Sequence, residues 1–104
     1  MALDASSVHR LARAHLIGLC AVFRVSKVPR IYTSRWPREY GADMAMYSYD
    51  TMAIYINTGL HETIQDVYDS VAHEFCHHVT RSEPSEHGPR WRAAAKRAGI
   101  SPTP

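Results

Sequence analysis

Hydrophobic positions along this chain change their spacing several times, and each change predicts a new element. Between an Asp4 or Ser6 cap and about residue 25, apolar residues recur every three or four positions, which predicts an amphipathic helix. Pro29 then interrupts the chain, and residues 30–34 have the composition of a strand. The first third of the chain is therefore predicted to be a helix followed by a strand.

The middle of the chain predicts a hairpin and a second helix. Residues 42–49 and 51–57 are rich in Met, Tyr and Ile and flank a tight turn at 49–51, which is typical of two antiparallel strands. Residues 62–80 contain neither Pro nor Gly, and their apolar residues recur at helical spacing. This apolar stripe consists of Ile64, Val67, Val71, Phe75 and Val79.

A third helix is expected at residues 89–98, with Gly88 as its N-cap, Pro89 as its first residue and Gly99 at its end. The predicted order is one helix, three strands and two helices, with no internal repeat and no linker. We therefore expect one α+β domain over residues 1–104, in which a small antiparallel sheet packs on helices.

Composition fits this picture and narrows the classes of partner. A chain of 104 residues with 45% hydrophobic and 21% charged residues is ordinary for one small globular domain. No apolar run approaches the roughly 20 residues that span a bilayer, so no membrane contact is expected. The net charge is only +2, but basic residues cluster at 24–38 and 90–97, which keeps nucleic acid open as a partner.

The strongest chemical signal lies in the second helix, in His73-Glu74-Phe75-Cys76-His77. One helical turn places the two histidines on one face, where both can reach one zinc ion, while Glu74 can contact a metal-bound water. A shuffled chain of this composition would show the motif with a probability of about 2%, so its setting beside the apolar stripe adds weight. It predicts His73 and His77 as ligands and Glu74 as catalytic base.

A catalytic zinc site needs a third protein ligand and one open position, so the chain after His77 must return to the metal. Glu83, Glu86 and His87 are the candidates. Glu83 stands where the longer pattern HExxHxxGxxH has its last histidine, but Thr80 replaces the glycine of that pattern. His87 directly precedes the Gly-Pro start of the third helix, where a ligand would be well fixed.

Three segments resemble a known family. HEFCHH at residues 73–78 and HGPRW at residues 87–91 are similar to the signature of the SprT-like zinc metallopeptidases, which is HExxH, a loop and then His-Gly-x-x-aromatic. The strand sequence at residues 54–57, Ile-Tyr-Ile-Asn, resembles the strand that precedes the zinc helix in that family. The resemblance spans roughly residues 31–99 and describes a minimal version that lacks a C-terminal zinc ribbon.

The resemblance implies a zincin-like HExxH metallopeptidase fold and one Zn²⁺ per chain. It implies that His73, His77 and His87 bind the zinc, that Glu74 is the base, and that the substrate is a protein or peptide. Zinc would acidify its bound water, Glu74 would take the proton, and the hydroxide would attack a carbonyl that the metal polarises. The strand ending at Asn57 is expected to offer its edge to an extended peptide.

Other reactive residues have structural interpretations. Cys20 and Cys76 are too few for a disulfide framework and are expected to be buried thiols. His78 is expected to hydrogen-bond rather than to bind metal. Surface or helix-edge positions are expected for His9, His15 and His61. The residues considered for oxyanion stabilisation, each more commonly structural, are Tyr47, Tyr49, Tyr55 and Arg90.

The N-terminal segment and the function class each leave an alternative. The basic and apolar residues near the start fit a structural helix better than an export signal, because Asp4 precedes the basic residues, so an intracellular protein is expected. Besides an enzyme, the domain could be a binding module that keeps zinc for structure, or a nucleic-acid-associated scaffold. Glu74 favours the enzyme, because a structural site has no use for a carboxylate beside an open position.

Overall fold

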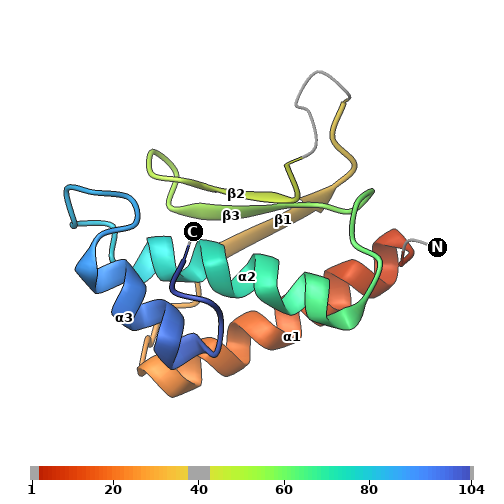
Figure 1. The fold of residues 1–104 in the computed structure, drawn as a ribbon. Helices are drawn as coiled ribbons and strands as arrows, with labels where there is room; N and C mark the ends of the chain where they lie inside the picture. The colour runs from red at the N-terminus through yellow and green to blue at the C-terminus, as the bar shows by residue number, and fades with distance from the viewer. Residues whose placement is uncertain (1–2, 38–42, 104) are drawn as a thin grey trace.

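The computed structural model describes residues 3–37 and 43–103. Figure 1 shows a small sheet that lies over the helices, with α2 directly beneath it. The expected order of elements and the α+β class are confirmed. The elements are α1 (Ala5–Phe23), β1 (Arg30–Ser34), β2 (Ala45–Ser48), β3 (Ala53–Asn57), α2 (Ile64–Val79) and α3 (Pro89–Ala98).

The sheet is mixed, so the expected all-antiparallel sheet is wrong in one of its two pairings. The strand order is β1-β3-β2, with β2 antiparallel and β1 parallel to β3. The hairpin from β2 to β3 is present, but the chain leaving β1 crosses to the far side of β3 before β2 begins. The composition of a strand does not encode its direction relative to a neighbour, so the sequence could not reveal this crossing. The predicted hairpin start at residue 42 lies outside the described residues.

The core lies between α1, α2 and the inner face of the sheet. Ile54 and Ile56 of β3 are fully buried against the helices, and Tyr47 of β2 is 7% exposed beside them. Each fully buried aliphatic or aromatic side chain contributes about 1.5–3 kcal/mol relative to exposure. The helical members of this core are Val8, Ala12, Leu16, Leu19, Cys20, Val67, Val71, Ala72 and Phe75.

Side chains fix the ends of the helices. Asp4 caps α1 by accepting a hydrogen bond from the Ser7 amide at 2.8 Å. Thr63 and Asp66 form a reciprocal capping box at the start of α2. Because of this box, α2 begins at Ile64 and not at residue 62 as expected. Ile64 was expected to belong to the buried apolar stripe, but its side chain is 51% exposed. Among the described helices, none is both long and apolar enough to cross a membrane.

Candidate metal centre

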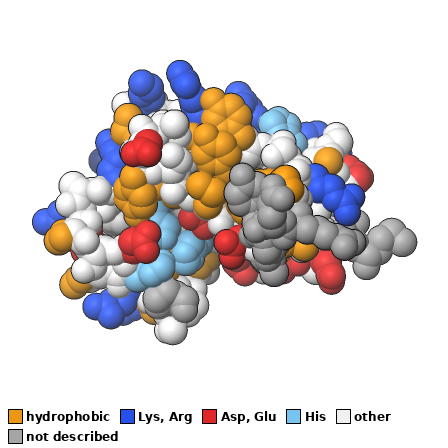
Figure 2. Space-filling view, turned by 90° about the horizontal axis from the view of Figure 1, so that it is seen from above, with side chains coloured by type: hydrophobic (Ala, Val, Ile, Leu, Met, Phe, Trp, Pro, Cys, Tyr) orange, Lys and Arg blue, Asp and Glu red, His pale blue; other side chains and the backbone are white. Residues whose placement is uncertain are grey.

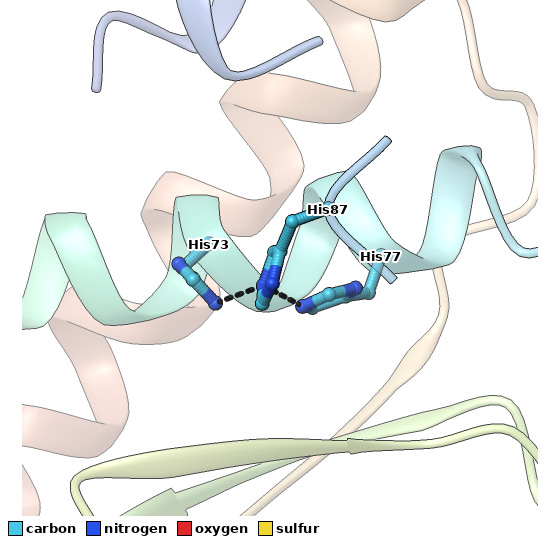
Figure 3. Close-up of side chains that lie close together, drawn as sticks. All are labelled: His73, His77 and His87. Atoms are coloured by element: carbon cyan, nitrogen blue, oxygen red, sulfur yellow. Dashed lines mark hydrogen bonds between the residues drawn. The ribbon is translucent and has the colours of Figure 1, made fainter. Parts of the chain in front are cut away.

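Three histidine side chains converge from α2 and the loop before α3. His73 and His77 project from one face of α2, and His87 reaches between them (Figure 3). The Nε2 atom of His87 lies 3.4 Å from Nε2 of His73 and 3.1 Å from Nε2 of His77. One nitrogen from each ring lies within 4.8 Å of the others, so the group can hold a metal ion. The structure thus brings together the three predicted ligands.

The spacing and chemistry of these nitrogens fit a tetrahedral cation site. Zn–N bonds of about 2.0–2.1 Å at tetrahedral angles separate the ligand nitrogens by about 3.3 Å, close to the two distances observed. Lone pairs on facing imidazole nitrogens repel each other, and so do two protonated rings, whereas one cation attracts all three lone pairs. Three neutral imidazoles suit zinc and several other divalent transition metals.

Burial keeps two of these imidazoles in the form that binds metal. Burial, followed by the effect of the neighbouring His73 and His87 rings, lowers the pKa of His77 to about 4. The pKa of His73 is lowered by burial and by the nearby His87. Both rings are therefore neutral at pH 7, and a metal ion does not have to displace their protons.

Two tyrosines of the β2 segment contact consecutive histidines of α2. The Tyr49 hydroxyl lies 3.0 Å from Nδ1 of His77, which is the ring nitrogen that points away from the metal group. Two residues earlier, the Tyr47 hydroxyl lies 2.7 Å from Nδ1 of His78, and this pair is buried. The expectation that His78 hydrogen-bonds is confirmed, and it is absent from the metal group. The sequence alone did not reveal that Tyr49 contacts His77.

Trp91 on α3 forms one wall of the histidine group. Its ring centroid lies 4.9 Å from that of His73, 5.7 Å from that of His77 and 4.6 Å from that of His87. The indole is fully buried. The sequence placed Trp91 only on the apolar face of its helix, yet its ring also limits the orientations open to all three imidazoles.

The loop that carries His87 is tied down by Glu83. The Glu83 carboxylate accepts hydrogen bonds from the backbone amides of Arg90 at 2.8 Å and Trp91 at 3.1 Å, and so caps α3. A Cβ atom at Gly88 would lie only 2.8 Å from the Glu83 carboxyl carbon, so the absence of a side chain there makes the contact possible. Glu83 is thus occupied as a cap and is absent from the metal group.

Glu74 is a buried carboxylate on the same helical turn as the histidines. It is 8% exposed, and burial, followed by the charges of Glu86 and Asp43, raises its pKa to about 8. A divalent cation held by the histidines would oppose this rise, because it favours the ionised form. Glu86 lies close enough to act on Glu74, but it is exposed and absent from the metal group. Figure 2 shows histidine side chains grouped on this face, with acidic side chains beside them.

One of the remaining histidines differs from expectation. His61 was expected near the surface but is fully buried, where Nδ1 donates to the Asn57 carbonyl at 2.8 Å and Nε2 accepts from the Ser70 hydroxyl at 2.8 Å. This pair of bonds compensates for its burial and ties the end of β3 to α2. His9 is exposed and bonded to Thr33, as expected for a surface position.

The cysteines behave as expected. Cys20 and Cys76 are free and buried, and burial raises the pKa of both thiols, that of Cys76 to about 12. A thiol so hard to ionise is a poor metal ligand at neutral pH, and Cys76 packs instead in the cluster around Trp91. It does not compete with the three histidines.

The expected peptide-binding edge is wrong. The strand ending at Asn57 is β3, which pairs with β1 on one side and with β2 on the other, so its backbone is already used. The crossing after β1, which the sequence did not reveal, moves β3 to the centre. Edge strand β2 (Ala45–Ser48) contacts α2 and leads into Tyr49 beside His77. It is the sheet edge nearest to the metal group in the described residues.

Comparisons with known proteins add no relative. No protein-family profile, curated protein sequence or solved structure matches the chain. The geometry of this site is therefore what indicates the function.

Proposed function

We propose that this protein is a zinc-dependent metallopeptidase of the SprT-like type. The observation that carries the proposal is the convergence of three imidazole Nε2 atoms beside Glu74, a buried carboxylate that is not one of the three ligands. This donor set leaves a tetrahedral zinc ion one open position. A structural site usually closes that position with a fourth protein ligand.

Each residue of the site has a separate role in this proposal. His73, His77 and His87 would hold the zinc, which, when bound, supplies a Lewis acid that acidifies water and polarises a carbonyl. Glu74 would accept the proton of the attacking water and pass it to the leaving amine. In the metal-free chain burial raises the pKa of Glu74 to about 8, and a bound cation would favour the ionised form again, which supports a carboxylate that accepts and releases a proton near neutral pH.

Edge strand β2 supports a peptide as the substrate. No strand of the described residues pairs with its outer edge, and an extended chain could pair there through main-chain hydrogen bonds. Because β2 runs directly into Tyr49, such a peptide would pass close to His77. Main-chain pairing would make the enzyme tolerant of substrate sequence, since the side chains of the peptide would contribute little to binding.

The alternative is a zinc-stabilised binding module without catalysis, associated with nucleic acid through its basic residues. Two contacts support a structural role for the metal site. Trp91 of α3 packs against His73 of α2, and Glu83 caps the start of α3. The buried Glu74 carboxylate favours the enzyme. A scaffold gains nothing from a buried, partly ionised acid and incurs its desolvation cost.

Hydrolysis of a labelled unfolded protein by the zinc-loaded chain tests the proposal. Glu74→Gln keeps the size of the side chain but cannot accept the proton, so it should retain zinc and reduce the rate by roughly a factor of a hundred or more. Glu62→Gln, at an exposed position just before α2, is the matched control and should leave the rate unchanged. Equal rates for the wild type and Glu74→Gln would reject Glu74 as the base.

A further inference from the structure

A second site lies apart from the histidines, in a cleft of about 810 Å³. It is bounded by the end of α1, the loop 24–29, the turn between β2 and β3 and the end of α2. These segments lie together at the left end of the molecule in Figure 1. None of the three metal-group histidines lines the cleft. Its volume is in the range of pockets that bind small ligands, about 300–1,000 Å³.

The polar part of the lining is strongly cationic. Arg24, Lys27 and Arg30 follow one another at three-residue intervals along the loop, and Arg81 reaches the cleft from the opposite side, just after α2. Among the described residues that line the cleft, none is an Asp or Glu. Figure 2 shows Lys and Arg side chains gathered along the left and upper margins of the molecule. Four cations around one hollow without a carboxylate attract an anion.

Much of the remaining lining is apolar, and Phe23 is held in place by its neighbours. Phe23 packs edge-on against Phe75, with ring centroids 5.1 Å apart, and the Arg97 guanidinium lies 4.7 Å from its ring centre. The other apolar side chains of the lining include Val25, Val28, Met52 and Val79. This wall suits the uncharged body of an organic ligand rather than a bare inorganic ion.

The backbone adopts its least common conformations at this cleft. Arg24 has a φ of 55° and Met52 a φ of 53°, and both line it. They are the only non-glycine residues with positive φ in the described parts of the chain. Such conformations cost energy in residues with a side chain and are concentrated at binding and catalytic sites. At Arg24 this conformation also ends α1 and turns the chain into the basic loop.

We propose that this cleft binds a small organic phosphate, with the phosphate group on the cations and the apolar body against the wall near Phe23. Arginine forks bind phosphate oxygens in pairs, and Lys27 adds a further positive charge. The cations surround a hollow with an apolar wall, which favours a compact ligand over a polyanionic strand. The inference goes beyond the proposed peptidase activity and does not depend on it.

An occupant of this cleft would lie next to the end of α2, the helix that carries His73 and His77. His78 lines the cleft, is held by Tyr47 and directly follows His77. The Tyr47 and Tyr49 rings are in edge contact, with centroids 5.0 Å apart, and Tyr49 contacts His77. A ligand in the cleft therefore has a short chain of packed side chains to the metal group.

Backbone amide NMR of the zinc-loaded full chain tests the proposal, with adenosine monophosphate (AMP) as the probe. Inorganic phosphate and adenosine serve as the phosphate-only and body-only probes. AMP should cause saturable shifts at 24–30, 51–52 and 78–81, phosphate should bind more weakly, and adenosine should have little effect. Raising the salt concentration should weaken AMP binding, because the contacts are ionic.

Charge reversal supplies the matched variants. Lys27→Glu with Arg30→Glu should weaken AMP binding roughly tenfold or more, whereas Arg10→Glu with Arg13→Glu makes the same charge change on exposed α1 positions and should not.

Three results would overturn the proposal. They are the absence of AMP shifts at low salt, equal weakening by both double variants, and tighter binding of oligothymidylates with affinity that grows with their length. The last result would assign the surface to nucleic acid. If Lys27→Glu with Arg30→Glu fails to fold, the salt dependence of AMP binding to the wild type decides. AMP binding that does not weaken with salt would then overturn the proposal.

Discussion

The Tyr49 hydroxyl lies 3.0 Å from His77 Nδ1, on the opposite side of the imidazole from the nitrogen that faces His87. When Nε2 gives its lone pair to a metal, the ring proton must be on Nδ1, so His77 donates this hydrogen bond to the tyrosine oxygen. The bond therefore selects the tautomer and the ring orientation that metal binding requires. Partners of this kind are typical of histidine ligands in metal sites.

Removing this partner should weaken metal binding without unfolding the protein. Tyr49→Phe should lower zinc affinity about 10–100-fold, because His77 loses the group that fixes its tautomer. Tyr49 is 44% exposed, so the loss of its hydroxyl should cost little stability. Competition with a chromophoric chelator measures the affinity.

Tyr47→Phe is the matched control, from β2 two residues before Tyr49. It removes a buried hydrogen bond to His78 and should reduce the free energy of unfolding by about 1–3 kcal/mol. Its effect on zinc affinity should be much smaller than that of Tyr49→Phe. If the two variants changed zinc affinity equally, Tyr49 would have no specific role in positioning His77.

Gly88→Ala should disturb the loop that presents His87. The new Cβ would lie 2.8 Å from the Glu83 carboxyl carbon, so the carboxylate must leave the amides of Arg90 and Trp91. Loss of this cap should cost about 0.5–2 kcal/mol of stability and also weaken zinc binding. Chemical denaturation and chelator competition measure the two effects.

A double-mutant cycle separates this clash from other effects of alanine at position 88. In a Glu83→Ala background the cap is already absent and the new methyl group has room, so Gly88→Ala should then cost much less. Equal costs in both backgrounds would contradict the proposed contact between Glu83 and the start of α3.

Removal of metal should destabilise the protein and loosen α3 before α1. Zinc at 1,000 times its dissociation constant stabilises the folded state by about 4 kcal/mol. His87 and Trp91 link that effect to α3, because Trp91 of α3 packs against all three histidines. Thermal unfolding and amide hydrogen exchange, each with and without chelator, measure the loss. Equal amide exchange rates in α1 and α3 after metal removal would contradict a stabilising effect of the metal that is local to α3.

The metal-free protein should be most stable near pH 6.5. The pKa of His77 falls from 6.5 to about 4 on folding, so the unfolded chain binds more protons between these values and stability decreases as the pH falls through this range. Lowered pKa values of His73 and His78 act in the same direction. Glu74 has the opposite effect, since its pKa rises from 4.5 to about 8 and stability decreases as the pH rises towards 8.

Glu74→Gln isolates the alkaline side of this profile. In metal-free protein it should remove the loss of stability between about pH 6.5 and 8, while the acid side persists because the histidines are unchanged. Urea denaturation across this pH range gives the comparison. An alkaline loss that survives in Glu74→Gln would assign the effect to another group.

Local signals in the sequence predicted much of this fold. Residues 30–34 and 89–98 match β1 and α3 in both bounds, because Pro29, the Gly-Pro pair and Gly99 mark the ends of these elements. The parallel pairing of β1 was missed, because it depends on where the chain passes between residues 34 and 45. The same error misassigned the sheet edge that is available to a peptide.

The site was predictable where its residues are close in sequence. The His73 and His77 spacing follows from helix geometry, and His87 was placed by its position just before Gly88 and Pro89. Tyr49 could not be found in this way, because its contact with His77 depends on how β2 packs over α2. The cap that Glu83 makes was also missed, since a carboxylate six residues before Pro89 lies outside the usual capping positions.

Metal content by mass spectrometry on the purified chain is the sharpest test of the three-histidine centre, with His87→Ala and the exposed His9→Ala measured in parallel. We expect about one zinc ion per chain in the wild type and in His9→Ala, and little in His87→Ala. No zinc in the wild type after expression with ample metal, or undiminished zinc in His87→Ala, would contradict the three-histidine centre.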